Sequence, residues 1–434
     1  MNREPTLITR RSFLRTGLVG GSLAWSVPSF LHATMQTLQA ATQANPAKAG
    51  TGRDQPVLVV LQLAGGNDGL NTVVPVGNDD YHRARPALGI AKKDALRLDD
   101  GFALHPALSG FKSLFDEGRL AILHGVGYPN PNRSHFRSME IWHTATDSDK
   151  SALHGWIGRY FDNQCKGEDP AVGISLSAQT PQAFLCGSAK GVCFVDPGRF
   201  RVLDPSMQDD DDHAMMAGDG GNEGGSVGMI SGAAAITGDP LDFLERTALD
   251  AQVSSDEIQA IMKGTYDGSA YPGTRLAGDF RNVARMIAGG MPTRIYYVSL
   301  GGFDTHANQA GAHERLLRDV GDAVKAFLDD LKRQGNHDRV TLMAFSEFGR
   351  RVKENGSGGT DHGAAAPLFL AGAGVKAGLH GKFPGLADKD LLNGDVRHTT
   401  DFRSVYATVL GRVLKTDPKL VLGREFPLLD VMRA

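Results

Sequence analysis

Two short segments of the sequence concentrate carboxylate and imidazole side chains. One is Gly301–His306, G-G-F-D-T-H, and the other is Arg350–His362, R-R-V-K-E-N-G-S-G-G-T-D-H. Each follows an apolar, β-rich run, so these polar groups come where a strand is expected to end. Asp, Glu and His at strand ends are the side chains with which α/β proteins assemble metal sites of oxygen and nitrogen ligands. The pattern predicts a metal-dependent hydrolase or transferase and does not indicate a substrate.

Individual ligands can be assigned within these segments. An Asp and a His two positions apart can direct both side chains to the same side of an extended backbone. A second Asp-His pair lies in a glycine-rich loop before another apolar run, and a Glu follows the run V-T-L-M-A-F. We therefore expect the ligands to include Asp304, His306, Glu347, Asp361 and His362. Such a set suits Zn²⁺, Mn²⁺ or Fe, and Mg²⁺ favours its oxygen atoms.

Some of these residues admit a second interpretation. The Asp304/His306 pair could instead cap a loop. Arg350 or Arg351 could steady an anionic group with two hydrogen bonds, or could mark a solvated helix end. His313 opens the next expected helix, and we expect it at the surface or as a cap rather than as a ligand.

The first residues have the pattern of an export signal. Arg10-Arg11 precedes Ser12-Phe13-Leu14, as in twin-arginine signals. The weakly apolar segment Gly17–Leu31 is too short and too interrupted to span a bilayer. We expect residues 1–40 to be a signal peptide, 41–55 a linker and 56–434 a single domain. The twin-arginine translocase would then be a partner during export, and the protein would be periplasmic or secreted without a stable membrane anchor.

The charge balance argues against a nucleic-acid partner. The chain has a formal net charge of −3 at pH 7, and loss of residues 1–40, with four arginines and one glutamate, leaves about −6. A nucleic-acid-binding protein needs a basic face. Residues from about 206 to 238, with the acidic run Asp209–Asp212, are expected to form a flexible, solvated insertion. A calcium-binding loop is the alternative, although the usual alternating ligand spacing is missing.

Three cysteines allow at most one disulfide bond. Cys186 and Cys193 flank a glycine-containing turn and could pair across a hairpin in an oxidising compartment. Two buried thiols are the alternative.

Apolar runs alternate with helical patterns along the chain, which predicts an α/β fold. Strands are expected at Val57–Leu63, Leu120–His124, Arg294–Leu300, Val340–Phe345 and Pro367–Ala371. Helices are expected at Ser134–Thr144, Gly311–Arg333 and Thr399–Leu414, the last capped by Thr399 or Thr400. Strands separated by helices describe a doubly wound, mostly parallel sheet with helices on both faces.

Four motifs occur together and in order after the expected signal. They are L-x-G-G-N-D-G-L-N-T-V-V-P at Leu63–Pro75, N-R-S-H-F at Asn132–Phe136, G-G-F-D-T-H-x-x-Q at Gly301–Gln309 and S-E-F-G-R-R at Ser346–Arg351. In these motifs the chain resembles an exported bacterial family, domain of unknown function 1501. That family resembles in fold the alkaline-phosphatase-like superfamily, which includes sulfatases, phosphodiesterases and phosphosugar mutases. Residues Gly359–Val375 look like the superfamily's final metal-histidine segment.

The resemblance implies an alkaline-phosphatase-like domain and roles for single residues. Asp68, or Asn67, is the nearest match to the metal-binding acid after the first strand. Ser134 matches the nucleophile at the helix start after the second strand, and Arg350 is an arginine that could hold the anion. Asp304, His306 and His362 match the later ligands.

The chain also departs from the superfamily pattern. Glu347-Phe348 stands where the superfamily has Asp-His, and a Phe cannot bind a metal ion. The resemblance therefore leaves two alternatives. One is an enzyme, with a single metal if the second position is lost, that acts on phosphate or sulfate esters of small molecules or polymers. The other is a non-catalytic periplasmic binding or assembly protein on the same fold.

Overall fold

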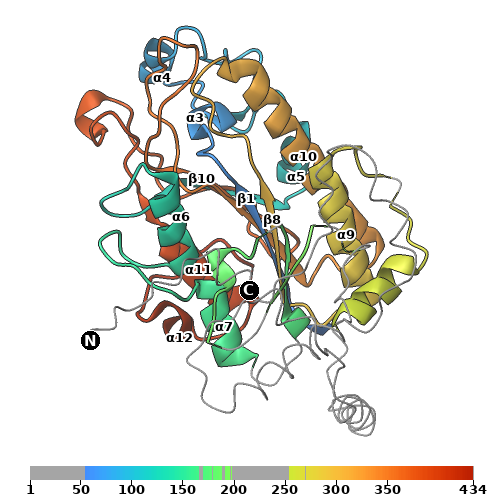
Figure 1. The fold of residues 1–434 in the computed structure, drawn as a ribbon. Helices are drawn as coiled ribbons and strands as arrows, with labels where there is room; N and C mark the ends of the chain where they lie inside the picture. Colours follow the sequence, from blue (N-terminus) through green and yellow to red (C-terminus); the bar gives the residue numbers. More distant parts are fainter. Residues whose placement is uncertain are drawn as a thin grey trace, which may run out of the picture. The chain divides into compact units, whose positions relative to one another are not determined.

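The computed structural model describes residues 54–165, 170–177, 179–187, 191–195, 197, 254–268 and 270–433. The expected signal peptide, nearly all of the linker and the insertion at 206–238 lie outside these residues. Within the described residues, the main sheet has nine strands in the order β11-β5-β10-β9-β1-β8-β6-β7, with β12 paired to β5 (Figure 1).

The strand bounds agree with most of the predicted positions. The main sheet contains β1 (Val57–Leu63), β5 (Leu120–Gly127), β6 (Gly173–Leu176), β7 (Val192–Cys193), β8 (Ile295–Leu300), β9 (Val340–Phe345), β10 (Ala366–Ala371), β11 (Gly378–His380) and β12 (Thr400–Asp401). A smaller antiparallel sheet contains β2 (Val73–Val74), β3 (Leu96–Arg97) and β4 (Ala103–Leu104). β10 runs antiparallel to β5 and β9, whereas the other pairs of the main sheet are parallel. The predicted mostly parallel α/β sheet is therefore confirmed, with β10 as the exception.

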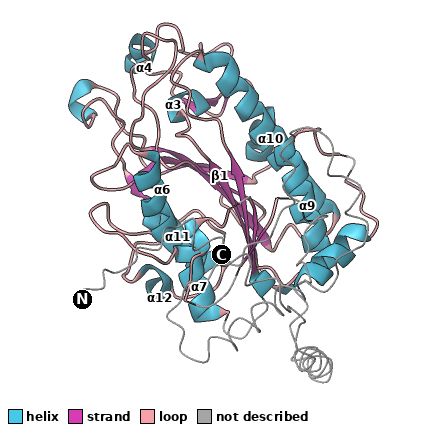
Figure 2. Cartoon of the chain, in the orientation of Figure 1, coloured by secondary structure: helices cyan, strands magenta, loops and turns pink. Residues whose placement is uncertain are grey.

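Helices cover both faces of this sheet (Figures 1 and 2). On one side lie α5 (Ser109–Asp116), α9 (Arg275–Gly289) and α10 (Gln309–Arg333), and on the other α6 (His135–Thr144), α7 (Trp156–Gln164), α11 (Phe402–Thr408) and α12 (Pro418–Leu422). The short α3 (Gly69–Thr72) and α4 (Asp79–Ala84) follow β1 and β2. Single turns of 3₁₀-helix occur at Pro170–Val172, Gln182–Phe184 and Asp388–Asp390, and a π-helical turn at Val409–Val413.

The central strand β1 shows how the sequence specifies this layering. Val57, Val59 and Leu61 belong to the core that β1 shares with α5, α9 and α10. Leu58 and Val60 belong to the core on the opposite face, with α6, α7 and α11. Because side chains alternate across a strand, a strand buried on both faces appears in the sequence as one continuous apolar run.

The start of the C-terminal helix was predicted wrongly. Thr400–Asp401 pairs with the end of β5 as β12, and α11 begins only at Phe402. Asp401, not a threonine, caps this helix, because its Oδ1 accepts a hydrogen bond from the Arg403 amide at 2.9 Å. A pairing with a distant strand leaves no local sequence pattern, so the boundary could not be placed from the helical periodicity.

Two other expectations can be compared with the described residues. Cys165, Cys186 and Cys193 are all present as buried thiols, which is the second of the two alternatives. Among the residues that the structure describes, no helix has both the length and the hydrophobicity required to cross a bilayer.

Candidate metal centre

Four segments of the chain meet at one edge of the main sheet. β8 and β9 are parallel to β1 and end just before Asp304 and Glu347 respectively. β10 runs in the opposite direction, so the residues that precede it, including His362, come to the same edge. α6 follows β5 and begins at His135. This is the edge at which open α/β sheets bind their ligands.

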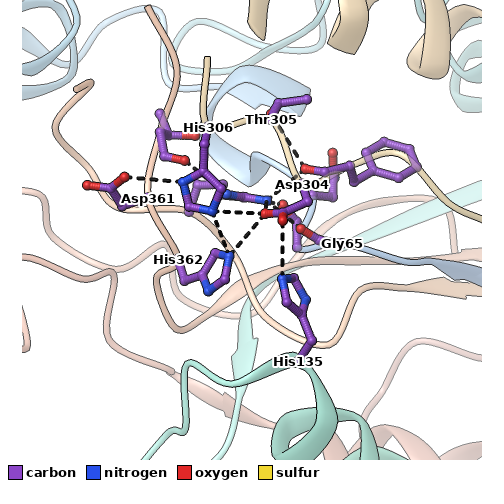
Figure 3. Close-up of polar contacts among 12 residues, drawn as sticks. Gly65, His135, Asp304, Thr305, His306, Asp361 and His362 are labelled. Carbon is purple, nitrogen blue, oxygen red and sulfur yellow. Dashed lines mark hydrogen bonds and ion pairs between the residues drawn. The ribbon is translucent and has the colours of Figure 1, made fainter. Parts of the chain in front are cut away.

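Polar atoms of four side chains converge there (Figure 3). His135, Asp304 and His362 each offer one ligand atom, and these atoms lie within 4.8 Å of one another. His362 Nε2 is 3.0 Å from Asp304 Oδ1, and His135 Nε2 is 3.6 Å from Asp304 Oδ2. His306 Nε2 is 3.1 Å from Asp304 Oδ1 and 2.9 Å from His362 Nε2. We name His135, Asp304, His306 and His362 the four-residue cluster.

The contact made by Nδ1 of each imidazole sets the orientation of its ring. In each case Nδ1 contacts an oxygen: Glu347 Oε1 at 2.9 Å from His135, Asp361 Oδ1 at 3.3 Å from His306, and the Arg133 carbonyl at 2.8 Å from His362. When Nδ1 donates its hydrogen to these oxygens, Nε2 presents its lone pair to the cluster. Hydrogen bonds of this kind orient the histidines of metal sites and set their tautomer.

In these tautomers, none of the three Nε2 atoms that face the cluster carries a hydrogen. His135 Nε2 is buried and has no hydrogen-bond partner in the described part of the chain. His306 Nε2 and His362 Nε2 lie 2.9 Å apart, so in these tautomers their lone pairs face each other. A cation between these atoms would satisfy all of them at once, so the residues fit a divalent metal ion. Three imidazoles and one carboxylate favour Zn²⁺, Mn²⁺ or Fe²⁺ over Mg²⁺, which prefers oxygen ligands.

Arg350 holds the carboxylate of this cluster. It is buried, and its Nη2 donates to Asp304 Oδ1 at 2.7 Å, while Nε and Nη1 donate to the carbonyls of Gly66 (2.6 Å) and Thr360 (2.9 Å). Partial burial opposes ionisation of Asp304, but the hydrogen bond from Arg350 and the charge of its guanidinium lower the pKa of this carboxyl to about 2. Arg350 is buried, so it does not mark a solvated helix end. The anionic group that it contacts is the carboxylate of Asp304, and its other donors bind backbone carbonyls.

The glycines after β1 allow the close approach that this arrangement requires. Gly65 has a φ of +119°, and a Cβ atom on it would lie 2.5 Å from the Asp304 nitrogen. Its own N–H donates to Glu347 Oε1 at 2.8 Å, which helps to hold the buried carboxylate against His135. Phe348 packs against the rings of His135 and His362, with centroids 4.9 and 4.8 Å away. It therefore forms an apolar wall of the site.

The structure places Asp68 outside the cluster. Asp68 is buried at the N-cap of α3, and its Oδ2 accepts hydrogen bonds from Arg85 at 2.6 Å and from Gln309 at 2.5 Å. The neighbouring Asn67 Oδ1 contacts His313 Nε2 at 2.8 Å. The surface position expected for His313 is wrong, since it is buried, and burial lowers the pKa of its imidazole to about 4.

At the start of α6, the structure places His135 in the four-residue cluster and Ser134 next to it as the N-cap residue. Ser134 is the exposed N-cap residue of α6, and its amide donates to Asn132 Oδ1 at 2.8 Å. The sequence analysis included His135 only as part of the motif N-R-S-H-F and did not name it as a ligand. Its place as the first helical residue after β5 was the signal that could have identified it. Glu347 and Asp361, which were expected as ligands, orient His135 and His306 in the structure.

Comparison with known families supports the motif-based resemblance. Residues 235–432 match the model of a family described as protein of unknown function (DUF1501). The matched region makes up less than half of this chain. This region contains Asp304, His306 and His362 of the four-residue cluster, whereas His135 precedes it. A comparison with curated proteins finds no match.

Solved structures resemble this chain only distantly. PsFucS1 sulfatase from Pseudoalteromonas sp. has a TM-score of 0.36 and 11% identity, covering 92% of this chain and 74% of that chain. The lipoteichoic acid synthase LtaP from Listeria monocytogenes has a TM-score of 0.37 and 9% identity, covering 88% and 78%. An alkaline phosphatase from the Antarctic bacterium TAB5 has a TM-score of 0.30 and 12% identity, covering 74% and 93%. These likenesses assign no role to any residue, so the function proposed below is derived from the side chains of the site.

Proposed function

We propose that this protein is a metal-dependent hydrolase or transferase that acts on phosphate or sulfate esters. The observation that carries the proposal is the orientation of His135, His306 and His362, whose Nε2 atoms converge on the carboxylate of Asp304. The ester class comes from the resemblance of the motifs. The twin-arginine pattern at Arg10-Arg11 supports placing the activity outside the cytoplasm, in the periplasm or in the medium.

The four-residue cluster would hold a single divalent ion. When bound, such an ion stabilises negative charge on the oxygen atoms of an ester. The pKa of Asp304 is about 2, so its carboxylate is ionised at neutral pH and available as a ligand. The side chains of Asp304 and His306 remain 47% and 45% exposed, which leaves an ester access to this edge of the sheet.

Ser134 is the group that we assign to the attack. It lies at the amino end of α6 beside His135, where the helix N-terminus favours an anionic group. Its Oγ would form a bond to phosphorus or sulfur as the bond to the leaving oxygen breaks. The serine proton would pass to solvent, and the leaving alkoxide would take up a proton as it departs. Water would then cleave the serine ester in a hydrolase, and an acceptor alcohol would do so in a transferase.

The proposal is tested with Ser134→Ala and with Ser151→Ala as a matched control. Ser151 is also exposed, and its side chain contacts Arg137 and Glu140, neither of which belongs to the four-residue cluster. Metal-loaded protein would be assayed with aryl phosphates and aryl sulfates. We expect Ser134→Ala to lower turnover by at least about 1,000-fold with unchanged metal content, and Ser151→Ala to match wild type. Full activity of Ser134→Ala would remove Ser134 from the mechanism, and failure of metal-loaded wild type to turn over any ester would reject the enzyme proposal.

A non-catalytic binding or assembly protein is the second candidate. It is favoured by Arg350, whose donors are committed to Asp304 and backbone carbonyls rather than to an incoming anion. It is also favoured by Phe348, which occupies the position of a ligand in the superfamily. Such a protein would bind a metal ion and show no turnover of esters in the same assay.

A further inference from the structure

A single buried side chain connects the two loops that carry most of the four-residue cluster. Gln309 is the first residue of α10 and is 0% exposed. Its Oε1 accepts hydrogen bonds from Thr305 Oγ1 at 3.0 Å and from Thr360 Oγ1 at 2.6 Å. Thr305 lies between Asp304 and His306, and Thr360 lies two positions before His362. One amide oxygen therefore binds one hydroxyl group from each ligand-bearing loop.

The other half of the amide is anchored to a buried ion pair. Gln309 Nε2 donates to Asp68 Oδ2 at 2.5 Å, and the same oxygen accepts from Arg85 Nη1 at 2.6 Å. A reversed amide would place Oε1 against the carboxylate, so the chemistry of the partners fixes its orientation. Arg85 also donates to the carbonyls of Arg351 (3.0 Å) and Val352 (2.9 Å). The ion pair thus ties Gln309 to the chain segment that leads into the second loop.

Backbone contacts join the same two loops. The Thr360 amide donates to the Thr305 carbonyl at 3.2 Å, and the Gln309 amide donates to the Gly358 carbonyl at 2.9 Å. Neither loop is part of a helix or a strand. Arg350 also bridges the loops, through Asp304 and the Thr360 carbonyl, and Asn355 Nδ2 donates to the His306 carbonyl at 2.9 Å. Gln309 differs from these in binding a side-chain hydroxyl of each loop through one buried oxygen atom.

We propose that Gln309, held by the Asp68–Arg85 ion pair, is a positioning residue that sets the distance between Asp304/His306 and His362. Asp68 acts on the site through Gln309 and not as a ligand. The inference rests on the proposed metal site, and it does not depend on which ester, if any, is turned over.

The test compares Gln309→Leu with Gln62→Leu in the full chain. Gln62 is also buried, but its side-chain contacts are Tyr297 and Met139. Amide hydrogen exchange of the metal-free proteins would be measured, followed by Zn²⁺ affinity in competition with a chromogenic chelator. We expect Gln309→Leu to speed exchange in residues 303–306 and 359–363 and to weaken Zn²⁺ binding about 10- to 100-fold. Gln62→Leu should do neither.

Two substitutions that change the charges at Gln309 and Asp68 give a second and more specific test. Gln309→Glu keeps an acceptor oxygen for both threonine hydroxyls but sets a carboxylate oxygen against Asp68, so Zn²⁺ affinity should fall. Combining it with Asp68→Asn restores a donor to that contact and leaves one negative charge beside Arg85. We expect the double variant to recover affinity to within about threefold of wild type, as coupled sites do in double-mutant cycles. Absence of this rescue would count against the proposal.

The outcomes separate this inference from the proposed function. If wild type binds Zn²⁺ and Gln309→Leu matches it in affinity and exchange, the positioning role is overturned while the metal site stands. If wild type binds no metal but Gln309→Leu loosens both loops, the positioning role stands and the proposed function falls. Equal effects of Gln62→Leu would show general destabilisation and would overturn the inference.

Discussion

At the scale of single residues, the site depends on the oxygen atoms that contact Nδ1 of each imidazole and so orient the ring. Glu347 is 1% exposed and contacts His135 Nδ1 at 2.9 Å, so it keeps Nε2 directed at the cluster. We predict that Glu347→Gln lowers metal affinity about 10- to 100-fold, because an amide accepts the Nδ1–H more weakly than a carboxylate. Competition with a chelator measures this.

A control for this change is available in the same chain. Glu354→Gln alters a carboxylate that binds the amides of Ala87 and Leu88, away from the imidazoles. It should leave metal affinity unchanged. Wild-type affinity in Glu347→Gln would mean that the ring of His135 is oriented by other contacts.

Some residues of this site could be predicted from the sequence, and others could not, for physical reasons. Asp304, His306 and His362 were predicted because they follow or precede apolar runs at short spacing. His135 was not named because the resemblance drew attention to the adjacent Ser134, and the pairing of His135 with a Glu 212 positions away leaves no local pattern. Asp68 was expected near the metal, since nothing in the sequence shows that Arg85 is buried against it.

At the scale of elements, the contact between α5 and α10 depends on a glycine. A Cβ atom on Gly110 of α5 would lie 2.1 Å from the carbonyl oxygen of Gly321 in α10, whereas one on Gly321 would have its nearest neighbour at 3.4 Å. Both substitutions to alanine gain about 1 kcal/mol of helix propensity. Only Gly110→Ala adds a clash that must push the helices apart.

We therefore predict opposite effects on stability for these two substitutions. Gly110→Ala should lower the free energy of unfolding by about 1 to 3 kcal/mol, the usual cost of overpacking, and Gly321→Ala should leave it unchanged or raise it slightly. Urea unfolding of the metal-free proteins measures both. Equal stability of the two variants would show that α5 and α10 do not approach as closely as described.

The ends of helices and strands were predictable only where the local sequence determines them. β1 and β9 have the predicted bounds, because glycines interrupt the apolar run soon after β1 and Ser346-Glu347 interrupts it after β9. α10 begins at Gln309, two residues before its predicted start. The antiparallel direction of β10 and the pairing of β12 depend on distant strands, and an apolar run does not indicate its own direction.

At the scale of the whole molecule, stability depends on a buried acid in α9 that does not belong to the site. Burial in α9, with a smaller contribution from Asp319, raises the pKa of Asp279 to about 6, against the opposing charge of Arg275. The folded state therefore binds this proton more tightly than the unfolded state, whose pKa is near 3.8. The stabilising contribution is complete below about pH 4 and is lost as the pH rises through about 6.

The corresponding prediction concerns Asp279→Asn. Asparagine removes the charge that is costly to bury, so we expect a gain of about 1 to 3 kcal/mol above pH 6 and little change at pH 4. Urea unfolding of metal-free wild type and variant between pH 4 and pH 8 would show the difference. A constant offset across this range would contradict the assignment of the effect to ionisation of Asp279.

The most direct test of the central claim is the metal content of the described cluster. Wild type, His135→Ala and the control His82→Ala would be purified without chelators, reconstituted with Zn²⁺, Mn²⁺ or Fe²⁺, and subjected to elemental analysis. His82 is exposed and contacts the Val76 carbonyl away from the cluster. We predict about one equivalent in wild type and in His82→Ala, and loss of the metal in His135→Ala. Wild type without bound metal after reconstitution, or His135→Ala with as much metal as wild type, would contradict the account.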